Sequence, residues 1–186
     1  MAEDDESLIL RCQKDPAAFE ALFRRHYRQL YVFARGMLGS DEEAEEAAQD
    51  VLMKIHQAAG TFKSGRRFAP WMYRIVSNHC KNILRHRQID HKHVEELEPQ
   101  DDIVPASPRT PLEIYADADV RQHVGQAITS MRPRYREVFY LRYMAGLSYK
   151  QIADALELTV SAVETRILRG KEMLRAKLIR MGLSPR

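Results

Sequence analysis

The chain has 186 residues, of which 45% are hydrophobic, and its 29 Lys and Arg against 26 Asp and Glu give a net charge of +3. This composition excludes a disordered or fibrous protein. No apolar run approaches about 20 residues and the chain starts with the acidic stretch Glu3–Glu6, so we expect neither a membrane span nor a signal peptide. Only Cys12 and Cys80 occur, far apart in the chain, which excludes a disulfide framework and a CxxC site and predicts a cytoplasmic protein.

Charged residues are grouped in blocks of alternating sign. Residues 1–50 and 94–117 are rich in acids, whereas residues 51–93 and 118–186 are rich in bases. Basic blocks in a nearly neutral chain predict binding of a polyanion, because only local charge can neutralise phosphates. Solvated helix faces are the alternative interpretation.

Hydrophobic residues recur at helical spacing almost throughout, which predicts an all-α fold. Asp15 as N-cap and Pro16 as first residue begin one helix, which ends at Gly39. Its predicted inward face comprises Phe19, Leu22, Phe23, Leu30, Phe33, Ala34 and Met37.

A capping box of Ser40 and Glu43 opens the next helix, and Gly60 ends it. A polar loop at residues 63–67 leads to a third helix, from about Phe68 to Arg87. These helices make a first domain, residues 1–93. The predicted inward residues of the two helices are Ala44, Ala47, Ala48, Val51, Leu52 and Ile55, then Met72, Ile75, Val76, His79 and Ile83.

Residues 94–117 are predicted to form a flexible acidic linker, since they contain four prolines and few aliphatic residues. The second domain, residues 118–186, is predicted to start with an amphipathic helix. Pro133 opens the following helix and Gly146 closes it. The protein is therefore expected to be two small helical domains joined by a flexible linker.

The segment from Ser148 to about Leu178 has the layout of a helix-turn-helix. A capping box of Ser148 and Gln151 opens its first helix, and Thr159 caps its second. An ordinary helical hairpin is the alternative, and a basic second helix favours DNA. The residues expected to face base edges are Ser161, Glu164, Thr165 and Arg169, with Arg166, Lys171 and Arg175 on phosphates.

Aromatic, basic and amide residues are interleaved in residues 62–85. Aromatic rings stack on unpaired bases while cations hold phosphates, so this mixture predicts a surface for single-stranded DNA. The alternative is that the aromatic residues belong to the core, which is expected in part for Phe68 and Trp71. The predicted contacts are Lys63, Arg66, Arg67, Phe68, Trp71, Arg74, Asn78, Lys81 and Asn82.

Two groups of side chains could suggest a metal site. The acids between Glu42 and Asp50 follow a helix N-terminus, where a solvated acidic face is the commoner explanation. His86, His91 and His93 have neither Cys nor carboxylate at ligand spacing. We therefore predict no metal, no cofactor and no catalytic residues.

Four segments together resemble the extracytoplasmic-function (ECF) class of bacterial RNA polymerase sigma factors. EAEEAAQDVL at residues 43–52 is similar to the family's polymerase-binding helix, and WMYRIVSN at residues 71–78 to the segment that melts and reads the minus-ten element. LSYKQIA at residues 147–153 and VETRI at residues 163–167 are similar to the segments that read the minus-thirty-five element. All four occur in the family's order.

The resemblance implies an initiation factor without chemistry of its own that directs RNA polymerase core to promoter DNA, with an anti-sigma factor as a further partner. It assigns Glu43, Glu46, Gln49 and Asp50 to polymerase binding. Three positions depart from the family's pattern, namely Ala47, Glu157 and Glu164. A left-handed Glu157 would cost on the order of 1 kcal/mol.

Two other functions are considered. A regulator that binds duplex DNA alone would leave the aromatic and basic block of the first domain without a role. A carboxylate or histidine metal enzyme would need ligands that converge, and the sequence pattern does not predict them.

Overall fold

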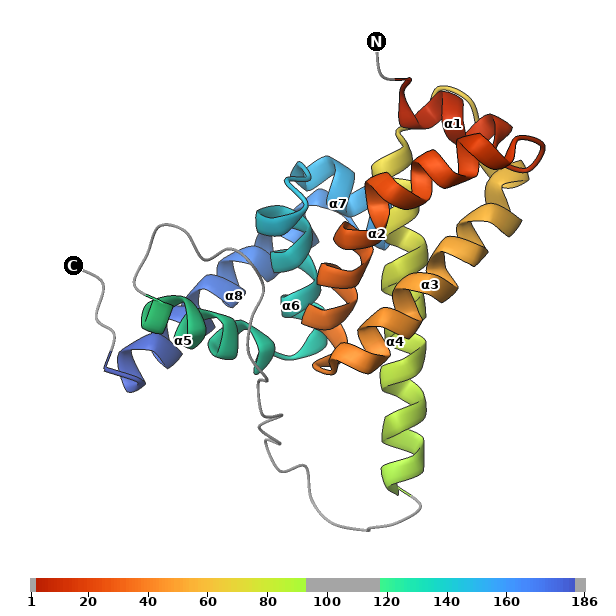
Figure 1. Cartoon of the computed structure of the whole chain (residues 1–186). Helices are drawn as coiled ribbons and strands as arrows, with labels where there is room; N and C mark the ends of the chain where they lie inside the picture. The colour runs from red at the N-terminus through yellow and green to blue at the C-terminus, as the bar shows by residue number, and fades with distance from the viewer. Residues whose placement is uncertain (1–2, 93–117, 183–186) are drawn as a thin grey trace.

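The computed structural model describes residues 3–92 and 118–182, so the whole of the predicted linker, residues 94–117, lies outside the described residues. Every regular element among them is helical, which confirms the all-α fold (Figure 1). The elements of the first half are α1 (Asp5–Arg11), α2 (Pro16–Leu38), α3 (Asp41–Ala58), the 3-10 turn η1 (Ala59–Thr61) and α4 (Phe68–Lys92). Those of the second half are α5 (Ala118–Thr129), α6 (Pro133–Phe139), the π turn η2 (Tyr140–Met144), α7 (Tyr149–Leu156) and α8 (Val160–Arg180).

The predicted signals at both ends of α2 and at the start of α3 are present in the structure. The Asp15 carboxylate accepts from the backbone N–H of Ala17, and Gly39 ends α2 with φ 84°. Ser40 accepts from the N–H of Glu43, as predicted, but the carboxylate of Glu43 pairs with Arg87. The third predicted helix continues beyond Arg87 to Lys92.

The short helix α1 was not predicted. Its cap is Asp4, which accepts from the N–H of Ser7, and it buries Leu8 and Ile9 against the rest of the first domain. Because so short a helix is marginal by itself, tertiary contacts stabilise it.

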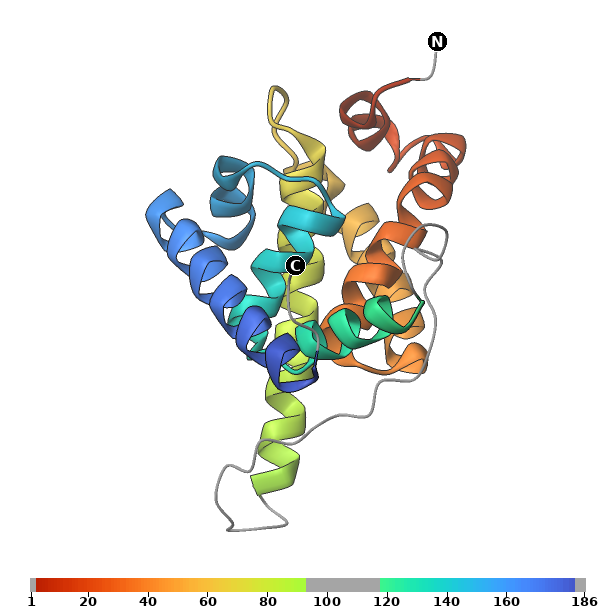
Figure 2. The same ribbon diagram turned by 90° about the vertical axis from the view of Figure 1, so that its left-hand side faces the viewer.

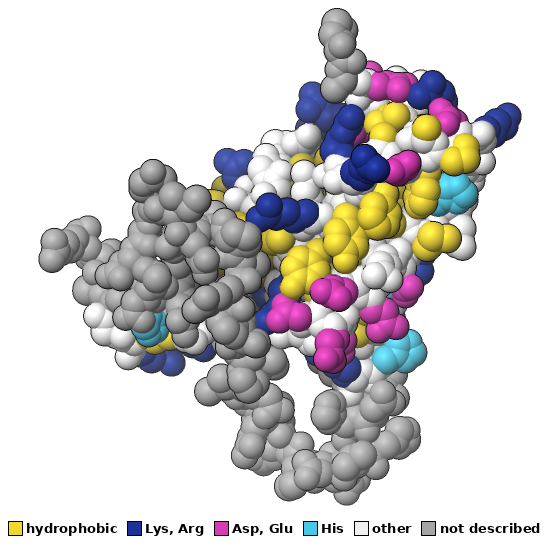
Figure 3. Space-filling model, in the orientation of Figure 1, with side chains coloured by type: hydrophobic (Ala, Val, Ile, Leu, Met, Phe, Trp, Pro, Cys, Tyr) yellow, Lys and Arg dark blue, Asp and Glu magenta, His cyan; other side chains and the backbone are white. Residues whose placement is uncertain are grey.

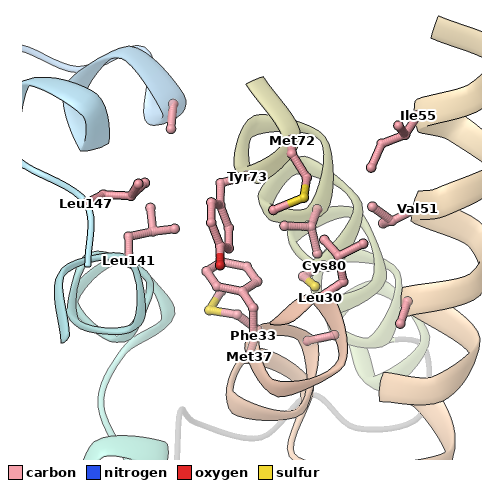
Figure 4. Close-up of a cluster of buried hydrophobic side chains, with 14 of the residues drawn as sticks. Leu30, Phe33, Met37, Val51, Ile55, Met72, Tyr73, Cys80, Leu141 and Leu147 are labelled. Atoms are coloured by element: carbon pink, nitrogen blue, oxygen red, sulfur yellow. The ribbon is translucent and has the colours of Figure 1, made fainter. Parts of the chain in front are cut away.

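The core of the first domain lies between α2, α3 and α4 (Figure 4). The predicted stripe of α3 is buried in full. On α2 the predicted inward face included a residue that is not buried, since Phe23 keeps 37% of its surface exposed. Residues labelled in the close-up show the arrangement: Leu30, Phe33 and Met37 come from α2, Val51 and Ile55 from α3, and Met72 and Cys80 from α4.

Both thiols are in this interior. Cys12 and Cys80 are free and buried, and burial raises the pKa of each thiol. For Cys80 the pKa is raised to about 12.

The helix-turn-helix of the second half is formed by α7 and α8. Ser148 and Gln151 make the predicted reciprocal capping box, and Thr159 caps α8 through the N–H of Ala162. Glu157 in the turn adopts the left-handed conformation, with φ 56° and ψ 44°. The turn thus has the geometry that glycine adopts without strain. Holding Glu157 in this conformation costs about 1 kcal/mol.

The two halves pack against each other. Helix α7 lies against α4, and α6 with the π turn lies against α2 (Figures 1 and 2). Figure 4 shows Leu141 and Leu147 facing Tyr73 and Phe33 across this boundary. No helix in the described ranges has the length and apolar character required to cross a membrane.

Candidate nucleic-acid interface

The N-terminal half of α8 forms one wall of a polar hollow of about 400 Å³. Ser161, Thr165 and Arg169 line it and are exposed, as the sequence predicts. Arg166 also lines the hollow but is half-buried. Hydroxyls and guanidinium groups are side chains of the kind that proteins use for base edges and phosphates, and here they lie in one concave surface.

Two residues that the sequence pattern did not indicate lie on the opposite wall. Arg134 and Tyr135, in the first turn of α6, line the same hollow. The Arg134 guanidinium lies 4.7 Å from the centroid of the Tyr135 ring, and a hydrogen bond from Arg169 lowers the pKa of Tyr135. The basic residues that follow Pro133 could have suggested a DNA contact, but the sequence does not show that this segment lies beside α8.

The remaining predicted residues of α8 are exposed but lie outside the lining of this hollow. They are Glu164, Lys171 and Arg175. Lys171 and Arg175 thus add exposed positive charge to α8 outside the lining of the hollow. Glu164 adds a negative charge next to it.

The aromatic residues of the first domain are mostly core, and the structure corrects one prediction. Phe68 is only 1% exposed, because its ring packs against His26 and Trp71 and its N–H donates to Glu6. It therefore has no free face for a base and is removed from the predicted contacts. Trp71 is half-buried and keeps part of its surface accessible.

The loop before α4 presents three cations. Lys63, Arg66 and Arg67 are all exposed, and the backbone turns at Gly65 with φ 82°. The N–H of Arg66 donates to the carbonyl oxygen of Lys63, which closes the turn. This loop is thus a compact positive surface at the start of α4.

The polar residues of α4 fall into two groups. Asn78 and Asn82 are exposed. Arg74 and Lys81 are half-buried and contact acidic residues of the second half: Arg74 Nη1 lies 3.4 Å from Glu157 Oε1, and Lys81 Nζ lies 3.2 Å from Glu137 Oε1.

Helix α3 presents the predicted acidic face. Glu46, Gln49 and Asp50 are exposed, whereas the carboxylate of Glu43 is engaged by Arg87. Asp50 approaches His79 on α4, with 3.4 Å between Oδ2 and Nε2.

His79 itself is held between α3 and α4 by opposing charges. Burial and the Lys54 ammonium lower the pKa of His79, and Asp50 and Glu46 oppose this shift. The neutral imidazole accepts at Nδ1 from Lys54, across 2.6 Å.

An apolar groove of about 360 Å³ lies beside the acidic face. Phe23 and Met53 are its exposed apolar members, at 37% and 52%. Figure 3 shows an apolar stripe over α2 and α3 with acidic side chains along one margin. The groove is lined by Phe19, Phe23, Tyr27, Gln49, Leu52 and Met53.

Within the described ranges 3–92 and 118–182, no three His, Cys, Asp or Glu side chains come together as a metal site. His86 is exposed. The side chains of the other two histidines considered, His91 and His93, are outside the described part.

Comparison with known proteins gives the same order of regions along the chain. Residues 22–89 match Sigma-70 region 2, and residues 121–174 match Sigma-70, region 4. The ECF RNA polymerase sigma factor SigM of Mycobacterium tuberculosis is 30% identical over 92% of this chain and 82% of its own. The RNA polymerase sigma factor CarQ of Myxococcus xanthus is 29% identical over 87% of this chain and 89% of its own.

Two solved structures share the fold. The sigma factor RpoE of Bartonella quintana, in complex with the anti-sigma factor NepR, has a TM-score of 0.74 at 20% identity and covers 87% of this chain and 96% of its own. CnrH, in complex with the cytosolic domain of CnrY, has a TM-score of 0.70 at 24% identity, with 96% and 99% covered. The sequence relatives and the two matched regions together show that the chain belongs to the ECF family of RNA polymerase sigma factors.

Proposed function

We propose that the chain binds RNA polymerase core and directs it to promoters, where it recognises two DNA elements and holds the strand that is opened. The observation that carries this proposal is the presence in one chain of three different surfaces: a polar hollow on α8, a basic and amide surface around α4, and an acidic face with an apolar groove on α2 and α3. A regulator that binds duplex DNA alone would use only the first. The factor contributes no catalytic group, and it acts in the cytoplasm with the polymerase.

The polymerase-binding surface is the acidic face of α3 together with the apolar groove. Gln49 lines the groove, and Glu46 and Asp50 are exposed on the same helix. Phe23 and Met53 supply exposed apolar area. A partner with a basic margin and an apolar ridge fits this surface, since apolar contacts provide affinity and charges provide orientation. Glu43 is proposed to support this face indirectly, because it fixes Arg87.

The minus-ten surface combines the loop cations with the exposed amides of α4. Lys63, Arg66 and Arg67 would hold phosphates, and Asn78 and Asn82 would contact unpaired base edges. Trp71 offers the remaining aromatic surface. Arg74 and Lys81 would join them in the DNA-bound state.

The minus-thirty-five surface is the hollow between α6 and α8. Ser161, Thr165 and Arg169 would meet base edges in the major groove, because the first turns of a recognition helix enter it. Arg134, with Lys171 and Arg175 farther along α8, would contact phosphates. Glu164 can accept from a cytosine amino group. We therefore expect the promoter sequence that this chain prefers to differ from the sequences preferred by its relatives.

An anti-sigma protein is proposed as a further partner. RpoE of Bartonella quintana is described in complex with the anti-sigma factor NepR, and its fold is similar to this one. The exposed apolar groove is a surface that such a protein could cover as an alternative to polymerase.

The decisive experiment is a pull-down with purified RNA polymerase core followed by run-off transcription on a promoter library. The proposal expects a stable complex and transcripts from a subset of promoters that share two spaced elements. Duplex binding without core binding would instead establish the regulator function.

A further inference from the structure

Helix α1 and the residues that follow it contact both ends of the loop that joins α3 to α4, residues 59–67 (Figure 1). We call this segment the cation loop, because Lys63, Arg66 and Arg67 are exposed on it and are the proposed phosphate contacts of the opened strand. Exposed loops are more mobile than the helices they connect. The position of these three cations therefore depends on what fixes the two ends of the loop.

Helix α4 follows a residue that cannot cap it. This residue is Arg67, whose guanidinium has no acceptor, and the third residue of the helix, Pro70, has no N–H. The backbone N–H of Phe68 donates instead to Oε1 of Glu6, across 3.0 Å. A carboxylate from α1 therefore takes the place of the local cap, and its negative charge is favourable at a helix N-terminus.

The end of α3 is held by the same part of the chain. Nε2 of Gln13 donates to the carbonyl oxygens of His56 and Gln57, across 3.0 and 3.2 Å. Both carbonyl groups belong to the last turn of α3, where a helix leaves such groups without partners of its own. Gln13 also lies beside the loop itself, since a Cβ built on Gly60 would be 3.4 Å from its Oε1.

Helix α1 is in turn attached to the rest of the first domain. Leu8 and Ile9 are buried, with 3% and 1% of their surface exposed. Asp5 Oδ2 lies 2.9 Å from Nε2 of His26 on α2, and the same carboxylate pairs with Arg25. The segment can therefore transmit the position of α2 to both ends of the cation loop.

We propose that residues 5–13 set the shape of the cation loop, and that Glu6 and Gln13 are positioning residues for the opened strand. Glu6 acts through the start of α4 and Gln13 through the end of α3, so neither has to contact DNA. The inference rests on the proposed role of Lys63, Arg66 and Arg67 in holding that strand.

Trp71, the sole tryptophan of the chain, reports on the loop before polymerase is added. Its ring centroid lies 5.4 Å from that of Phe62 in the cation loop and 6.0 Å from that of Phe68. Glu6→Ala removes the acceptor of the Phe68 N–H, so acrylamide should quench the fluorescence of Trp71 more strongly than in wild type. Glu6→Gln keeps an oxygen that accepts from the same N–H and should be quenched like wild type. Glu20→Ala, which removes an exposed acid from α2, controls for charge.

The functional test measures strand opening by the factor bound to polymerase core, as permanganate reactivity of unpaired thymines. The promoter is one that wild type transcribes, at a concentration that gives half-maximal opening. Glu6→Ala should lower the opened fraction about fivefold, as expected for the loss of one helix cap. Gln13→Glu, which sets acceptors against both carbonyl oxygens of α3, should act similarly. Glu6→Gln and Glu20→Ala should open DNA like wild type.

Affinity for core should be unchanged in all four variants, because none of these positions lines the apolar groove or belongs to the acidic face of α3. Normal opening by Glu6→Ala and Gln13→Glu overturns the inference, whatever the quenching shows. Reduced opening with unchanged quenching also overturns it, since Glu6 would then act elsewhere. So does a defect that Glu6→Gln shares or that lost core binding accompanies, because the role of Glu6 would then not be to position the loop through this hydrogen bond.

A variant of the loop itself separates the inference from the proposed function. Arg66→Ala combined with Arg67→Ala removes two of the loop cations and should reduce opening. Normal opening by this double variant refutes the proposed role of the loop in strand binding. Defective opening by the double variant together with normal opening by Glu6→Ala and Gln13→Glu refutes only the inference.

Discussion

Arg136 on α6 donates through Nη2 to the backbone carbonyl oxygen of Met37, 2.7 Å away in the last turn of α2. The last carbonyl groups of a helix have no partner within it, so a residue of the second half satisfies one that the first half leaves open. Arg136 also donates to the carbonyl oxygen of Thr129. One side chain therefore joins α2, α5 and α6.

Replacing this arginine is expected to destabilise the folded chain. Arg136→Met removes hydrogen bonds of a charged donor, each of which contributes about 1.5–3 kcal/mol. We expect a decrease of about 2 kcal/mol in the free energy of unfolding, measured by urea denaturation. Arg132→Met, at an exposed position of the same segment, is the control, and equal midpoints for the two variants would contradict the expectation.

The docking surface on α2 and α3 is tested with exposed residues that the fold does not need. Met53→Glu and Glu46→Lys should each weaken binding to polymerase core at least about tenfold, because one inserts a charge into the apolar groove and the other reverses a charge of the acidic face of α3. Affinity is measured with fluorescently labelled factor. Glu172→Lys, on the exposed side of α8, should bind core like wild type. Normal binding by both docking variants would place the polymerase surface elsewhere.

Different residues of α8 are expected to recognise the base sequence and to bind phosphates. Arg169→Ala removes a residue that lines the hollow, so it should cost ~1–3 kcal/mol and relax preference at one promoter position. Arg175→Ala should weaken binding to all sequences and lower the slope of log affinity against log salt by about 1. Binding titrations at several salt concentrations, on duplexes with single substitutions, distinguish the two. Identical profiles would refute the division.

Asn78 is expected to act during strand opening. Its exposed amide can donate to and accept from an unpaired base edge, so Asn78→Ala should reduce run-off transcription about tenfold on duplex DNA. Pre-melting the downstream element should restore part of this loss. Arg24→Ala, an exposed change on α2, serves as control. Wild-type activity of Asn78→Ala on both templates would make Asn78 an ordinary surface residue.

The lowered pKa of His79 predicts that the free energy of unfolding depends on pH. Its pKa in the folded protein is lowered from 6.5 by burial and by Lys54, so between these two pKa values the unfolded chain binds more protons than the folded one. The contribution is unfavourable and appears as the pH falls below about 6.5. Wild type should therefore lose more stability than His79→Gln between pH 7.5 and pH 5.5 in urea titrations. Parallel losses would show that His79 does not cause the change.

The helices were predictable because local signals mark their ends. Asp15 with Pro16, the Ser148 and Gln151 box and Thr159 all form the predicted caps, since such contacts involve residues only two or three positions apart. Helix α1 has a cap of the same kind, but it is stabilised by burial of Leu8 and Ile9, which periodicity over so short a segment does not reveal.

The site was less predictable, because the spacing of residues along one helix does not indicate which other element packs on that face. Asn78 and Lys81 have the same spacing relation to the core stripe, yet only Lys81 meets Glu137. Phe68 has the residue type of a stacking platform and is core. Arg134 joins Arg169 in one hollow only because α6 packs against α8.

The burial of the two thiols has a consequence for oxidative signalling. Oxidants attack the thiolate, and burial raises the pKa of Cys80 to about 12, so this thiol stays protonated at neutral pH. Burial acts in the same direction on Cys12. Both thiols are therefore poor targets for peroxide while the chain stays folded, and a change in their oxidation state would require the first domain to open.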